Sequence, residues 1–233
     1  MDIKVIASGS SGNAYLISDG YTNILLDAGI PFKQLQKALD FKISSINACF
    51  VTHCHKDHSK AVKELMRAGI NVYASQGTIN ECGWAGHRIK PMKAFETVYI
   101  GSMEVFAFDV EHDAPEPLGF LVKSKITNEK LLYFTDTYYL KYRFTELNYI
   151  MGECNYYYEK VAQDVSSDSL NKNLAERIIK SHMSLEHFLD LLKANDLSKV
   201  KQIYLLHLSD NNSDEELFKR KVAELAGAEV YVC

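Results

Sequence analysis

The sequence lacks several features, and each absence excludes a class of protein. No apolar run approaches the roughly 20 residues that cross a membrane, and nothing at the start resembles a signal peptide. The five cysteines are scattered and form no C-x-x-C pair, which is typical of reduced thiols in a cytoplasmic protein rather than of a disulfide framework. The formal charge of −4 leaves no overall basic excess for binding nucleic acid.

What is present fits one globular unit. With 233 residues, of which 47% are hydrophobic, the chain can bury one full-sized core. It shows no internal repeat, low-complexity linker or domain boundary, so we predict a single domain over residues 1–233.

The most informative stretch is a cluster of histidines and an aspartate directly after an apolar run that ends at Val51. It reads H-x-H-x-D-H and consists of His53, His55, Asp57 and His58. Imidazole nitrogen and carboxylate oxygen are ligands of divalent ions, and two histidines two positions apart in extended backbone point to the same side. The spacing therefore predicts a metal site, with Asp57 and His58 available to a second ion.

Strands and helices alternate in both halves of the sequence. We expect strands at 2–7, 14–18, 21–27, 46–52, 71–74, 103–110, 118–123, 130–135, 147–153, 200–206 and 229–233. We expect helices from Pro31, at 59–68, at 174–179, from Ser184 and after 213–216, whereas 77–101 has no clear pattern. This order predicts a two-sheet α/β sandwich with the site along the edge where the strands end.

The same position, directly after an apolar strand, holds three further ligand-type residues. They are His112, Asp136 and His207. Beside the H-x-H-x-D-H cluster, they complete a set of seven candidate metal ligands.

This set resembles the metallo-β-lactamase superfamily, over nearly the whole chain from Gly9-Ser10-Ser11-Gly12-Asn13 to His207. The resemblance implies an αββα sandwich of two mixed sheets with outer helices. It also implies two divalent ions, for which the histidine-rich donors with a bridging carboxylate suit zinc, with manganese or iron as alternatives. The first ion takes His53, His55 and His112, and the second takes Asp57, His58 and His207. Asp136 bridges them, and Asp27 supports the cluster from behind.

Further motifs resemble the phosphodiesterase branch of that superfamily. β-Lactamases typically carry cysteine or serine where this chain has Asp136, which argues against lactam hydrolysis. Ser181-His182-Met183-Ser184 resembles the H-x-S motif of the phosphodiesterases, and Met151-Gly152-Glu153 resembles the strand end that orients its histidine. The resemblance implies catalytic roles for Asp57, His182 and Glu153, with His182 protonating the leaving oxygen.

The substrate is where the sequence leaves alternatives. The chain resembles small enzymes related to tRNA 3′-processing endonucleases, but only 24 positions separate His112 from Asp136, so the arm that grips tRNA is absent. It also resembles phage anti-Pycsar phosphodiesterases, which hydrolyse 3′,5′-cyclic nucleotides such as cCMP and cUMP to 5′-monophosphates, and YycJ-like DNA exonucleases. We expect a cyclic nucleotide substrate, because the chain is compact and acidic and its 14 tyrosines can stack a base.

The resemblance also implies a homodimer and a role in phage counter-defence. The scattered cysteines and the lack of a long apolar run predict a cytoplasmic location and no membrane partner. Nucleic acid is a partner only for the exonuclease alternative. Two other classes remain as alternatives: a binding module without catalysis, and a thioester hydrolase of the glyoxalase II kind. The latter would not need His182 and Glu153.

Overall fold

The computed structural model describes residues 1–209 and 212–233. Contacts among these residues divide the chain into two compact units. Unit 1 comprises Met1–Asp109 and Ala114–Glu129, and unit 2 comprises Val110–Asp113 and Lys130–Cys233. A single domain over residues 1–233 stays a prediction.

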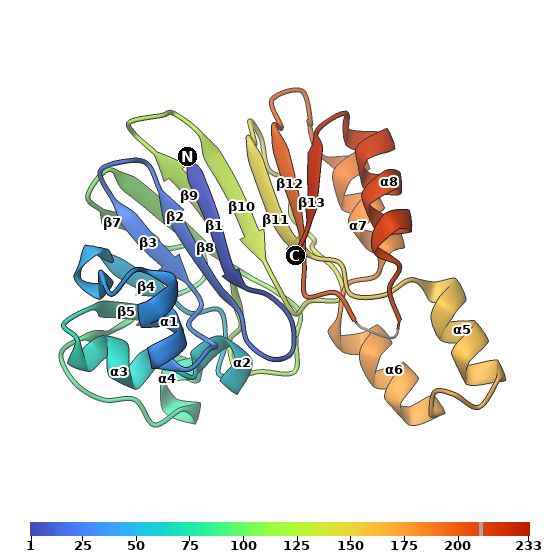
Figure 1. Ribbon diagram of the computed structural model, residues 1–233, viewed down its shortest axis with the longest axis horizontal. Coiled ribbons are helices and arrows are strands. Elements are labelled where there is room, and N and C mark those ends of the chain that lie inside the picture. Colours follow the sequence, from blue (N-terminus) through green and yellow to red (C-terminus); the bar gives the residue numbers. More distant parts are fainter. Residues whose placement is uncertain (210–211) are drawn as a thin grey trace. The chain divides into compact units, whose positions relative to one another are not determined.

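Unit 1 contains a six-stranded mixed sheet in the order β1-β2-β3-β4-β5-β6 (Figure 1). Its strands are β1 (Asp2–Ala7), β2 (Ala14–Ser18), β3 (Asn23–Leu26), β4 (Ala48–Phe50), β5 (Asn71–Ala74) and β6 (Ile89–Pro91). The first three pair antiparallel, and β3 to β6 pair parallel. Parallel strands are usually covered on both faces, and β4 is buried along its whole length.

Short helices and a second layer of strands cover this sheet. The helices are α1 (Phe32–Ala38), α2 (Lys56–Ser59), α3 (Val62–Arg67) and α4 (Gln76–Glu81), with a 3₁₀ turn at Ile43–Ser45. Leu35 of α1 and Leu65 of α3 share one apolar cluster with Val72 of β5. The second layer is the antiparallel set β7 (Thr97–Ile100), β8 (Met103–Asp109) and β9 (Leu118–Ser124). Phe120 of β9 meets Phe50 of β4 with ring centroids 5.6 Å apart, so unit 1 is layered helix, sheet, sheet.

Unit 2 is a parallel sheet with helices. Strands β10 (Lys130–Phe134), β11 (Tyr149–Glu153), β12 (Gln202–Leu206) and β13 (Glu229–Val232) pair in chain order. Helices α5 (Tyr158–Ser166), α6 (Lys172–Ser181) and α7 (Leu185–Ala194) lie between β11 and β12 in the chain, and α8 (Glu215–Ala226) lies between β12 and β13. Figure 1 shows α7 and α8 beside β12 and β13, and Phe188 of α7 lies 6.1 Å from Phe134 of β10 between ring centroids. Ser184 caps α7 as expected, accepting from the His187 amide.

The expected strands and helices are present with shifted ends, and the exceptions have identifiable causes. The helix expected at 59–68 is interrupted, because the Ala61 amide donates to the Ala28 carbonyl at 2.8 Å. The stretch 77–101, which showed no clear pattern in the sequence, contains most of α4 and the whole of β6 and β7. Helix α5 was not predicted, because it begins in a run of tyrosines, which favour strands. None of the helices in the described part of the chain has the length and apolar character to span a membrane.

Gly29 gives a direct test of how the sheet of unit 1 holds the histidine cluster. A Cβ at this position would lie 1.6 Å from the Asp57 carbonyl oxygen, and a Cβ at Gly12 would lie 2.5 Å from the Gly29 carbonyl oxygen. We expect Gly29→Ala to lower the free energy of unfolding by about 1–3 kcal/mol, because backbone must move to admit the methyl group. Urea denaturation measures this, and an unchanged midpoint would show that the contact is not rigid.

Candidate active site

In unit 1 the turn after β4 brings the predicted histidine cluster together. His53 Nε2 lies 3.1 Å from His55 Nδ1, and the rings of His53 and His58 have centroids 4.2 Å apart. Asp57 Oδ2 is 3.4 Å from His58 Nε2. His53 and His58 are almost fully buried. Four ligand-type side chains therefore converge within one short segment, as the spacing predicted.

Asp27 anchors this cluster from behind. It is fully buried at the end of β3, where it accepts hydrogen bonds from the Thr52 amide at 2.8 Å and from the Thr52 hydroxyl. Its Oδ2 lies 2.8 Å from His58 Nδ1, and Thr52 Oγ1 lies 3.0 Å from His53 Nδ1. A carboxylate on one ring nitrogen fixes the orientation of a histidine and directs its other nitrogen toward a ligand. This contact agrees with the supporting role expected of Asp27.

Asn13 is a site residue whose role the sequence did not reveal. Its amide donates to the Asp57 carbonyl at 2.7 Å, and its side-chain Nδ2 lies 3.2 Å from His58 Nε2. Its carbonyl accepts from the Gly29 amide at 2.8 Å. The Gly9–Asn13 turn therefore fixes the backbone that carries Asp57 and His58. The motif itself was recognisable, but its contact with residues about 45 positions away was not.

In unit 2 the buried carboxylate of Glu153 gathers a second group of side chains at the end of β11. Its Oε1 lies 2.5 Å from His182 Nδ1 and 3.4 Å from His207 Nδ1. Its Oε2 accepts from the amides of Thr137 at 3.0 Å and Met183 at 3.2 Å. The predicted pairing of Glu153 with His182 is therefore present as a direct contact.

Asp136 lies between two histidines of the same unit. Its Oδ2 is 3.7 Å from His112 Nε2, and its Oδ1 is 3.8 Å from His207 Nε2. Both separations exceed a hydrogen bond, yet they are near the spacing of two ligands on one ion, since each ligand atom lies about 2.0–2.2 Å from a bound zinc. The donors fit a divalent ion by chemistry and spacing. Asp136, Glu153, His182 and His207 also offer atoms within 4.8 Å of one another.

Three of these polar residues follow strands in the left-handed backbone region. Asp27 has φ 57°, Asp136 has φ 45° and His207 has φ 54°. Such a conformation costs a non-glycine residue about 1–2 kcal/mol. Strain of this kind persists where the surroundings over-determine it, and it gathers at functional sites.

The charges of Glu153 and His182 are coupled. Burial opposes ionisation of Glu153, but the charge of His182 and its hydrogen bond outweigh burial and lower the pKa of Glu153 below its usual 4.5. Burial likewise disfavours the charged form of His182, but the Glu153 carboxylate and its hydrogen bond raise the pKa of His182 above its usual 6.5. The pair therefore favours a protonated imidazole beside a carboxylate.

Asn155 completes the inner contacts of unit 2 and was also missed by sequence reasoning. Its Nδ2 donates to the His207 carbonyl at 2.7 Å and lies 3.2 Å from His207 Nδ1. His187, which matched no motif, lies 2.8 Å from the Tyr138 carbonyl oxygen through Nδ1. An isolated asparagine two positions after Glu153 carries no pattern that sequence reasoning could use.

Comparison with known proteins identifies the class. The model of the β-lactamase superfamily domain matches residues 22–208, so the chain belongs to that family. The fold of two mixed sheets with helices and the assignment as a hydrolase, both expected from the sequence, are confirmed.

Particular relatives cover almost the whole chain. Exodeoxyribonuclease YycJ of Bacillus anthracis is 28% identical over 97% of this chain and 89% of its own length. Exodeoxyribonuclease WalJ of Streptococcus pneumoniae is 29% identical over 98% and 90%. Among solved structures, the metallo-β-lactamase fold protein YhfI of Bacillus subtilis superimposes with a TM-score of 0.74 at 16% identity, over 99% of this chain and 95% of that one. Both curated relatives are named exodeoxyribonucleases.

Glu153 and His182 make the stability of the protein depend on pH, and the titration of each of the two side chains can be measured. Because the pKa of His182 is raised, its contribution to stability is complete below its usual pKa of 6.5 and is lost as pH rises through the folded value. The lowered pKa of Glu153 contributes stability above its usual 4.5, which is lost as pH falls through the folded value. In metal-free protein we expect the His182 imidazole to titrate above 6.5 by NMR. Glu153→Gln should bring the titration down, since burial remains and the carboxylate is gone. Titration of wild-type His182 at or below 6.5 would contradict the coupling.

Proposed function

We propose that this protein is a metal-dependent phosphodiesterase that shortens DNA from its ends. The observation that carries the proposal is the Glu153–His182 pair, held beside Asp136 and His207 within unit 2. Hydrolysis of a phosphodiester needs a proton on the departing oxygen, and a histidine kept protonated by a buried carboxylate is suited to supply it. The choice of DNA draws on the full-length relatives, which are named exodeoxyribonucleases.

The metal ligands that we propose are the seven expected from the sequence. They are His53, His55 and His112 for one ion, Asp57, His58 and His207 for the other, and Asp136 for both. When bound, two such ions supply activation of water and neutralisation of charge on the phosphate. Zinc suits the histidine-rich donors, and manganese is the alternative. Asp27 orients His58 through Nδ1, and Asn13 holds the backbone of Asp57 through its amide. Glu153 orients His182 through Nδ1, which leaves Nε2 to carry the proton for the leaving oxygen.

Hydrolysis of cyclic nucleotides, the substrate expected from the sequence, is a second candidate. Tyr138 and Tyr139 lie two and three positions after Asp136 in the sequence, and these residues are 39% and 47% exposed. Tyr139 packs edge-on against His187, with ring centroids 6.0 Å apart. Exposed tyrosines next to a proposed metal ligand can stack a single base. A homodimer, a cytoplasmic location and a role in phage counter-defence remain predictions.

Product analysis separates the two substrates. Purified protein with zinc or manganese is incubated with a short single-stranded DNA and with the four 3′,5′-cyclic mononucleotides, alongside Asp136→Ala and a chelator control. We expect wild-type protein to shorten the DNA, and both controls to leave it intact, because Asp136 serves both ions. Conversion of cyclic nucleotides to 5′-monophosphates with the DNA intact would replace the proposal by the second candidate.

The role of His182 has a sharper test in the choice of leaving group. We expect His182→Ala to slow DNA hydrolysis by about 10²–10⁴-fold while metal content stays the same. In a 4-nitrophenyl phosphodiester the leaving group is 4-nitrophenolate, which departs without needing a proton. The rate of its hydrolysis should therefore fall far less in the variant. Equal losses on both substrates, or loss of metal, would show that His182 is not the general acid. A thioester hydrolase or a binding module would show no phosphodiester hydrolysis to lose.

A further inference from the structure

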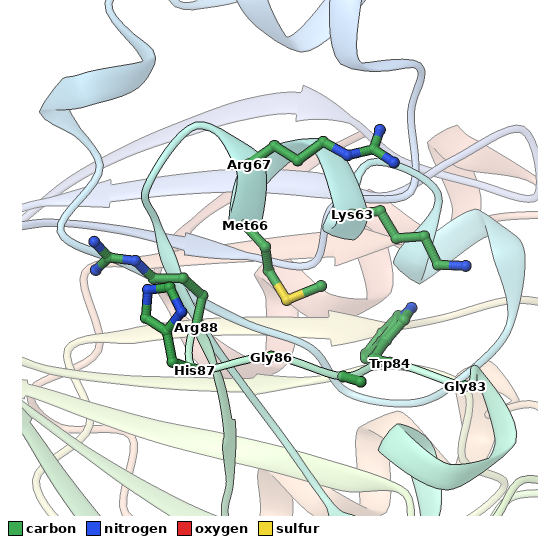
Figure 2. A pocket seen from close by; sticks show the side chains of 9 residues that line it. Lys63, Met66, Arg67, Gly83, Trp84, Gly86, His87 and Arg88 are labelled. Carbon is green, nitrogen blue, oxygen red and sulfur yellow. The ribbon is translucent and has the colours of Figure 1, made fainter.

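A pocket on unit 1 has the composition of a nucleic-acid subsite, and it is built from residues outside the proposed metal ligands. It lies between α3 and the loop that follows α4, with a volume of about 380 Å³. Met66 of α3 points toward this loop, which carries Trp84, and the nitrogen-bearing edge of the indole turns toward Lys63 (Figure 2). Trp84 is 7% exposed and belongs to the apolar cluster of unit 1, so the apolar lining of the pocket consists of Met66 and the accessible part of one largely buried indole.

The rim of the pocket is cationic. Lys63, Arg67 and Arg88 line it together with His87, and no carboxylate is among its lining residues in the part of the chain that the structure describes. Arg88 is held in place by a hydrogen bond from Nη1 to Asn71 Oδ1 at 3.1 Å. Three permanent cations around one cavity stand out in a chain whose net charge is −4. Such a rim is suited to phosphate groups.

A row of exposed cations runs from the histidine cluster to this pocket. Its members form two pairs, Lys56 and Lys60 at α2 and its C-cap, and Lys63 and Arg67 on α3. The two residues of each pair are four positions apart and share one face of a helical segment, and the break at Ala61 separates the pairs. The row starts between His55 and Asp57 and ends at the pocket rim.

We propose that the row and the pocket bind the backbone of single-stranded DNA, with one nucleotide seated against Met66 and Trp84. Cations spaced along a strand combined with an aromatic side chain are the elements with which proteins bind single strands without sequence preference. The inference rests on the proposed function for the choice of DNA as ligand. It adds a binding site on the unit that carries the histidine cluster, where substrate beyond the cleaved bond is held.

Trp84 is the only tryptophan in the chain, so its fluorescence reports on this pocket alone. Asp136→Ala protein, and wild-type protein in chelator, are titrated with a short oligothymidylate that neither cleaves. We expect a saturable change in Trp84 emission. Binding without any change in emission, or no binding by either protein, overturns the inference. An equal change with a polyglutamate peptide of the same charge also overturns it, because the site would then be selective only for negative charge.

The cations are tested through the salt dependence of binding, measured by the anisotropy of a labelled oligonucleotide. Removing two phosphate contacts should reduce the slope of log affinity against log salt by about 1.4. We expect this for Lys63→Gln with Arg67→Gln, both exposed positions whose replacement leaves the core unchanged. The matched control is Lys33→Gln with Lys37→Gln, two exposed lysines on α1, which should leave the slope unchanged. Equal slopes for the two double variants overturn the inference.

These binding measurements are independent of catalysis. If wild-type protein with metal does not cleave DNA, yet DNA changes Trp84 emission with the expected slope, the pocket stands and the proposed function fails. If DNA is cleaved while the pocket variants bind and cleave like wild type, the proposed function stands and the pocket inference fails.

Discussion

The left-handed backbone that follows each of three strands is the constraint on which the candidate site depends. Asp27, Asp136 and His207 all adopt left-handed backbone where β3, β10 and β12 end. This conformation is unfavourable for residues other than glycine, so it must be offset by contacts that only the folded chain supplies. At Asp27 the contacts are visible: one buried carboxylate engages the amide and hydroxyl of Thr52 and the ring of His58. The contacts that offset the strained backbone of Asp27 are therefore the same contacts that fix the orientation of His58.

Two buried carboxylates then do different work because their neighbours differ. Asp27 has a histidine that is itself a proposed metal ligand, so its effect is to fix an orientation. Glu153 has His182, and the two shift one another's pKa values toward the charged pair. A carboxylate next to a metal ligand tunes that ligand, whereas a carboxylate beside a histidine that binds no metal favours its protonated form. In the proposed function, the second arrangement makes His182 the proton donor.

Residues that follow an apolar strand could be predicted from the sequence, because strand and ligand are adjacent in the chain. The apolar runs predicted the strands, and the position directly after each strand then identified His53, His112, Asp136 and His207. Asn13 and Asn155 could not be predicted, because their roles lie in contacts with His58 and His207, which are 45 and 52 positions away. The cationic pocket was hidden for a related reason: overall charge averages over the surface, and only folding brings α3 beside the loop of Trp84.

Anomalous diffraction from crystals of metal-loaded protein tests the central claim most directly. The account predicts two peaks per chain: one ligated by His53, His55 and His112, and one by Asp57, His58 and His207. Asp136 should contact both ions, and His182 should remain bonded to Glu153 without touching either. A single peak held by Asp136, Glu153, His182 and His207, the four residues that unit 2 also brings within reach of one another, would contradict it. His182 would then be a ligand, and the proton donor would have to be sought elsewhere.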